Sequence, residues 1–136
     1  VKTDAVWNKI KQTEAAVKAQ NMYDSDKFTS DLMNSYAWDT ATLFAQSCGA
    51  NNQYSRQTSL NTTFSSTGTT EDVQCNMYDM ASNVTEWTTE TSNNSGYPCV
   101  CRGGNSDYSG IYTSYRSYDS TFNSPSHIGF RPILYL

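Results

Sequence analysis

The sequence predicts an α+β fold, with helices in the first third of the chain and short strands after it. Helix formers dominate an early segment, and apolar residues recur at helical spacing in a second one. Strand-like pieces follow at 84–89, 98–102 and 128–136. At 136 residues the chain is long enough for one domain with a modest core, so we expect a single domain over residues 1–136.

The first predicted helix covers about residues 13–23, because TEAAVKAQNMY combines good helix formers with a threonine that can cap the first turn. The second lies within 33–49, where Gly49 offers a left-handed stop. Its apolar stripe is predicted to face the core: Met33, Ala37, Ala41, Phe44 and Cys48. Residues 50–74 contain many turn formers and little apolar periodicity, which indicates a long surface excursion.

The composition excludes two kinds of partner. A net charge of −4 supplies no basic stripe for a phosphate backbone or an anionic membrane face, so we expect neither nucleic acid nor direct membrane contact. Only 16% of residues are charged, while Ser, Thr, Asn and Tyr are abundant, as suits an extracellular surface. No apolar run is long enough to cross a bilayer, so we expect any export or anchoring segment to lie outside this chain.

The four cysteines are predicted to form disulfides. They contain no CxxC pair, and His127 is the only histidine, so a zinc site is not indicated. A bond between Cys99 and Cys101 is sterically poor, which leaves Cys48–Cys101 with Cys75–Cys99, the pairing we favour, or Cys48–Cys99 with Cys75–Cys101. The alternative is four free thiols in a reducing compartment.

Several motifs occur in a characteristic order: YDMASNVTEW at 78–87, CRGGN at 101–105, Arg116, and GFRP at 129–132. This series resembles the formylglycine-generating, sulfatase-modifying family, and YAWDTA at 36–41 looks like that family's tryptophan-bearing helix. The resemblance implies a C-type-lectin-like fold with two helices and short, irregular antiparallel strands. It covers roughly residues 76–133, and the family's opening strand has no counterpart here, so the chain looks like the C-terminal two thirds of such a domain.

The resemblance does not extend to the family's chemistry. The family's two reactive cysteines would fall at Tyr108 and Thr113, and neither hydroxyl replaces a thiolate as a copper ligand or redox group. A related branch holds iron with several histidines, which a single histidine cannot supply. We therefore expect no enzyme activity. A copper oxidase that uses Cys99 and Cys101 stays as the enzyme alternative.

The resemblance also implies a structural calcium ion in the YDMASNVTEW segment. Its ligands would be side-chain oxygens and main-chain carbonyls, the donors that calcium prefers. By position in the motif these are Asp79, Ser82, Val84 and Glu86. The alternative is that the two carboxylates accept hydrogen bonds from loop amides, with no ion.

Residues 105–128 are predicted to form a ligand-binding surface. Ser, Tyr, Asn, Asp and Thr make up 17 of these 24 residues, a mixture typical of antibody-like binding loops and poor material for a core. This arrangement is similar to the variable proteins of diversity-generating retroelements, whose hypervariable patch lies at the C-terminal end of the same scaffold. The resemblance implies these ligand contacts: Asn105, Asp107, Tyr108, Ile111, Tyr115, Tyr118, Asp119, Phe122, Asn123, Ser126 and His127.

The sequence therefore predicts a non-catalytic display domain, secreted or held at the surface of a bacterium or phage, that binds a protein or another surface ligand. A structural alternative is a pilus or phage-tail component whose tyrosines bury against a neighbouring subunit.

Overall fold

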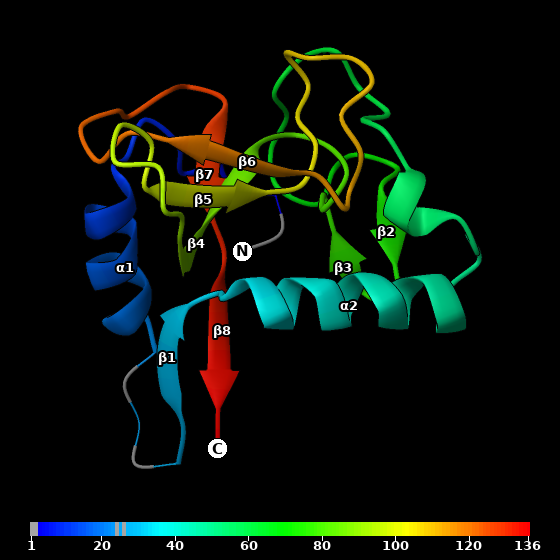
Figure 1. The fold of residues 1–136 in the computed structure, drawn as a ribbon. Coiled ribbons are helices and arrows are strands. Elements are labelled where there is room, and N and C mark those ends of the chain that lie inside the picture. The colour runs from blue at the N-terminus through cyan, green and yellow to red at the C-terminus, as the bar shows by residue number, and fades with distance from the viewer. Residues whose placement is uncertain (1–2, 24, 26) are drawn as a thin grey trace.

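The computed structural model describes residues 3–23, 25 and 27–136, and these form an α+β fold (Figure 1). In chain order the elements are α1 (Gln12–Gln20), β1 (Thr29–Leu32), α2 (Ser35–Cys48), the 3₁₀ turn η1 (Tyr54–Arg56), β2 (Val73–Gln74), β3 (Met77–Tyr78), β4 (Thr85–Thr91), β5 (Cys99–Arg102), β6 (Arg116–Asp119), β7 (Ile128–Phe130) and β8 (Pro132–Tyr135). The two helices and the strands at 84–89 and 98–102 lie where the sequence predicts them.

The main sheet has the strand order β6-β5-β4-β7. β5 pairs antiparallel with both β4 and β6, whereas β7 pairs parallel with β4, so the expectation of purely antiparallel strands is wrong. The predicted final strand is also two strands, because the chain leaves the main sheet at Arg131. β8 then pairs with β1, and Figure 1 shows this two-stranded ribbon running away from the sheet past α2.

α1 packs against β1 and against β4 of the main sheet, and two of its alanines, Ala15 and Ala19, are fully buried. Such small side chains let the helix backbone approach the strands closely. Trp87 of β4 fills the space between them, and its indole nitrogen donates a 2.9 Å hydrogen bond to the carbonyl of Ile10. Burial of this large aromatic side chain is a main contribution to the first hydrophobic core.

α2 begins where the Asn34 side chain accepts a 2.8 Å hydrogen bond from the amide of Ala37, which caps the helix. Its buried stripe is Ser35, Trp38, Thr42 and Ala45. The predicted stripe was wrong in its second half, since Phe44 is 52% exposed and Cys48 is also exposed. Gly49 is extended, with φ −84°, so it is no left-handed stop; a side chain there would meet the Ala45 carbonyl and Gln74.

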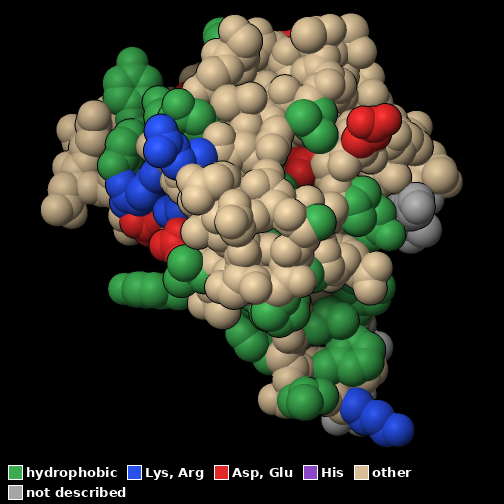
Figure 2. Space-filling view, turned by 90° about the vertical axis from the view of Figure 1, so that its right-hand side faces the viewer, with side chains coloured by type: hydrophobic (Ala, Val, Ile, Leu, Met, Phe, Trp, Pro, Cys, Tyr) green, Lys and Arg blue, Asp and Glu red, His purple; other side chains and the backbone are tan. Residues whose placement is uncertain are grey.

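Residues 50–74 do more than cross the surface. Tyr54 is fully buried under α2, in a second core with Trp38 and Met80, and its hydroxyl donates a 2.8 Å hydrogen bond to buried Asp72. On the face of the molecule that Figure 2 shows, backbone and neutral polar side chains cover most of the surface. This agrees with the low fraction of charged residues in the sequence.

The disulfide prediction is not met, because all four cysteines are free thiols. Cys99 and Cys101 lie two apart on β5 and pack in the core with Trp87. Cys48 is exposed at the end of α2, and Cys75 lies in the turn between β2 and β3. Among the described residues, no helix is both long and apolar enough to span a membrane.

Candidate ligand-binding pocket

The predicted contact segment folds around a pocket of about 220 Å³ beside β5 and β6. Seven of the eleven predicted contact residues line it: Asn105, Tyr108, Ile111, Tyr115, Tyr118, Asp119 and His127. The other four lie outside the lining. Asp107, Phe122 and Asn123 are exposed, and Ser126 is half-buried.

The first end of the loop is fastened by Asn105, which is buried rather than exposed as predicted. Its amide nitrogen donates a 2.8 Å hydrogen bond to the hydroxyl of Thr85 on β4. Its side-chain oxygen accepts from the amides of Asp107 and Tyr108, both at 3.0 Å, which sets the turn that starts the loop. Asn105 thus positions its neighbours as well as lining the pocket.

The middle of the loop is fastened by Thr113, which is fully buried. Its backbone amide donates to the carbonyl of Gln57 at 2.9 Å, and its own carbonyl accepts from the indole nitrogen of Trp38 at 3.1 Å. The loop is therefore tied to α2 and to the segment after η1, far away in sequence.

The tyrosines expose about half of their side chains: Tyr108 54%, Tyr115 46% and Tyr118 45%. Tyr108 meets His127 edge to face, with ring centroids 5.4 Å apart. These rings stand at the surface as the composition of the segment predicts, and they offer rigid contact area at low entropic cost.

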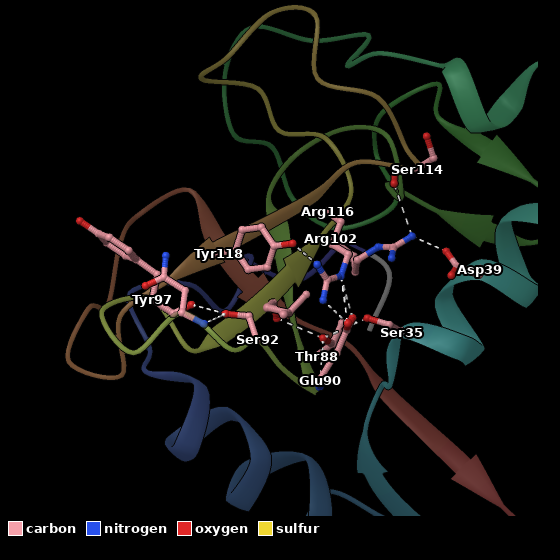
Figure 3. Close-up of polar contacts among 12 residues, drawn as sticks. Ser35, Asp39, Thr88, Glu90, Ser92, Tyr97, Arg102, Ser114, Arg116 and Tyr118 are labelled. Carbon is pink, nitrogen blue, oxygen red and sulfur yellow. Dashed lines mark hydrogen bonds and ion pairs between the residues drawn. The ribbon is translucent and has the colours of Figure 1, made fainter.

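Arg116 holds the last of these tyrosines in place. Its guanidinium lies 4.8 Å from the ring centroid of Tyr118, bonds to the tyrosine hydroxyl and forms a two-pronged ion pair with Glu90 of β4 (Figure 3). Nearby, Arg102 of the CRGGN motif pairs with Asp39 of α2 and so ties β5 to the helix. Both arginines support the sheet edge and do not line the pocket.

Four lining residues are not among the predicted contacts: Thr85, Cys101, Ser117 and Ile128. Ser117 lies within the predicted segment 105–128 but is not among the predicted contacts. Thr85 and Cys101 come from neighbouring strands, and sequence spacing alone does not reveal that pairing.

The predicted calcium loop has its carboxylates already engaged. Both oxygens of Glu86 accept 2.8 Å hydrogen bonds from the guanidinium of Arg131, and those of Asp79 accept from the Gly68 amide at 2.7 Å and from the Thr70 hydroxyl. The described residues contain no cluster of three or more His, Cys, Asp or Glu side chains suited to a metal. As arranged, this donor set does not fit calcium, which would have to displace Arg131; calcium at Asp79, Ser82, Val84 and Glu86 stays a prediction.

The groups considered for oxidase chemistry lie in unreactive surroundings. Burial, and then the charge of Asp119, raise the pKa of the Cys101 thiol to about 12, and the same two causes raise that of Cys99. A thiolate is therefore scarce at neutral pH at either position. Of the two family cysteine positions, Thr113 is committed to holding the loop, and Tyr108 stands at the pocket wall.

The fold and pocket together define a two-helix α+β domain with a polar, tyrosine-rich pocket at the edge of its main sheet. The family model of the sulfatase-modifying factor enzyme 1-like domain matches residues 10–135, and the chain belongs to this family. This confirms the family named from the motifs and, with it, the C-type-lectin-like fold that membership implies. No curated protein and no solved structure matches the chain significantly.

Proposed function

We propose that the protein is a non-catalytic binding domain that recognises a protein or another surface ligand through residues 105–128, in the manner of retroelement-diversified variable proteins. The observation that carries this proposal is the convergence of seven predicted contact residues on one pocket. Composition and resemblance single out the predicted contact residues in the sequence, and seven of them line the same pocket.

The division of labour within the segment gives further support. The groups that fasten the loop, Asn105 and Thr113, are buried, whereas Tyr108, Tyr115 and Phe122 are exposed and take part in no core cluster. A surface of this kind can change its exposed side chains and keep its backbone, as a diversified binding protein requires. We propose secretion or display at the surface of a bacterium or phage, where such a protein would meet its ligands.

The test is to sequence the 3′ end of the gene in a population of the source cells. We expect substitutions concentrated at exposed positions such as 108, 115, 118 and 122, with position 113, Gly103 and Arg116 constant. An invariant segment, or changes spread evenly over buried and exposed positions, would contradict diversification.

A structural subunit is the second candidate, favoured by the exposed apolar side chains of Phe122, at 82%, and Tyr36, at 87%. Light scattering on the purified chain separates the two functions. A stable oligomer that a Phe122→Ser substitution dissolves would favour assembly, whereas a monomer would favour recognition of a foreign ligand.

A copper oxidase that uses Cys99 and Cys101 is the least favoured candidate, because both thiols have raised pKa values. Copper binding abolished by Cys101→Ser would support it.

A further inference from the structure

The pocket carries one carboxylate, Asp119, and no lysine or arginine among the residues that line it. Oδ1 of Asp119 accepts hydrogen bonds from the Ser120 amide at 2.7 Å and from the Asn123 side chain at 2.5 Å. Oδ2 of Asp119 accepts no hydrogen bond from the described residues, and Asp119 forms no ion pair with any of them. One carboxylate oxygen is therefore left for a donor from outside.

The neighbouring cation does not neutralise Asp119. The guanidinium of Arg116, three residues earlier on β6, donates its hydrogen bonds to Glu90 and to the Tyr118 hydroxyl. The hydrogen bonds with Glu90 are the main cause that raises the pKa of Arg116, so this cation is already matched by its own carboxylate.

The negative charge of Asp119 acts on another residue of the pocket lining. After burial, this charge is the next cause that raises the pKa of Cys101, a residue of the pocket lining on the neighbouring strand. A positive group entering the pocket would meet this unneutralised potential, and a negative group would be repelled.

The walls suit a cation as well. Tyr108, Tyr115 and Tyr118 are among the lining residues, and aromatic faces attract ammonium and guanidinium groups within about 6 Å; the Tyr118 ring already lies beside Arg116, so Tyr108 and Tyr115 are the rings left for a ligand. The volume, about 220 Å³, is below the range of about 300–1,000 Å³ usual for whole small-molecule ligands. It favours the entry of one side chain.

We propose that the pocket binds a single lysine or arginine side chain that projects from a protein ligand, with Asp119 as its counter-ion and the tyrosine rings as its walls. This inference rests on the binding function proposed above. It specifies the kind of ligand group that residues 105–128 of this chain would bind.

The experiment is a ¹H–¹⁵N NMR titration of the whole chain with N-acetyl-arginine amide, N-acetyl-lysine amide and N-acetyl-citrulline amide. Citrulline matches arginine in shape but carries no charge. We expect saturable shifts of backbone amides around the pocket with one or both cationic probes, and at least fivefold weaker binding of the citrulline probe.

Asp119→Asn should weaken binding of the cationic probe at least fivefold, because it removes the charge and keeps the shape. Glu71→Gln is the control: it removes an exposed carboxylate that is neither a predicted ligand contact nor part of the pocket lining, and it should leave binding unchanged. The dispersion of each spectrum reports whether the variant is folded, and the citrulline comparison on the unmodified protein needs no variant.

Equal binding of citrulline, undiminished binding by a folded Asp119→Asn variant, or no saturable shift with either cation would each overturn the inference. The population sequencing decides the binding function separately. Diversified positions without cation binding would refute the ligand chemistry alone, and an invariant segment would refute the diversified display instead.

Discussion

Replacing Glu86 by glutamine should destabilise the protein strongly. The Glu86 side chain is only 8% exposed, and that of Arg131 is 25% exposed. Burial acts to lower the pKa of Arg131, but the charge and hydrogen bonds of Glu86 outweigh it and raise the pKa, so the cation depends on this carboxylate. Glu86→Gln keeps the shape and removes the only carboxylate that is hydrogen-bonded to Arg131 among the described residues.

The expected cost follows from the geometry. Removing one partner of a buried ion pair costs roughly 3–5 kcal/mol, and the partial exposure of Arg131 points to the lower end, about 3 kcal/mol. With an unfolding entropy of about 2.1 cal/mol/K per residue, 136 residues give a fall in Tm of about 10 °C.

Calorimetry or thermal circular dichroism measures this fall, with Glu90→Gln as the control. Glu90 lies on the same strand and also pairs with an arginine, but its side chain is 30% exposed, so its loss should cost less than about 1 kcal/mol. Equal Tm values for the two variants would refute the reasoning. Each scan is run in EDTA and again in calcium, because a loss confined to calcium would mean that Glu86 serves an ion and not Arg131.

Three further predictions concern the core and its titrating groups. Gly103→Ala should cost more stability than Gly110→Ala in urea denaturation. Both glycines have positive φ, so alanine at either position costs about 1–3 kcal/mol of backbone strain, but only at Gly103 would the added Cβ lie 2.8 Å from the Trp38 ring. Equal losses of stability in the two variants would contradict this. Burial raises the pKa of Asp72 above its ordinary value despite the hydrogen bond from Tyr54. Between the ordinary and the raised pKa, the folded state therefore keeps a proton that the unfolded chain has released. The free energy of unfolding should therefore fall as pH rises from about 4 through the raised value, and Asp72→Asn should lack this component in urea titrations over pH; an unchanged pH slope would refute it. Ellman's reagent should titrate two thiols in the folded protein, Cys48 and Cys75, because Cys99 and Cys101 are buried. In guanidinium it should titrate all four. Fewer than four in guanidinium would instead indicate a disulfide.

The sequence was sufficient wherever the signal was local. Helical spacing located α2, and the β-branched and aromatic residues of VTEWTT located β4. The helix face was harder to predict, because Phe44 and Cys48 lie at helical spacing and yet point away from the core. The buried stripe is set by Trp38, which packs with Met80 and donates to Thr113, and those partners come from distant segments.

Long-range pairing accounts for most of the errors. β1 and β6 carry polar residues and gain their strand conformation from β8 and β5, so neither has a strong pattern of its own. The disulfide prediction failed for a related reason, since the side chains of Cys99 and Cys101 are taken up by the core. The predicted contacts that line the pocket lie close together in sequence, whereas Thr85 on β4 and Cys101 on β5 are distant in sequence and were not predicted to join them.

The fastening of the loop by Asn105 and Thr113 has a consequence for how this surface evolves. The hydrogen bonds that shape the backbone belong to a few buried groups, so replacing an exposed residue such as Tyr115 removes little that folding depends on. Most substitutions at exposed positions change stability by about 0.5 kcal/mol or less. Many loop sequences can therefore share one foldable scaffold, so that selection for stability constrains these exposed positions only weakly.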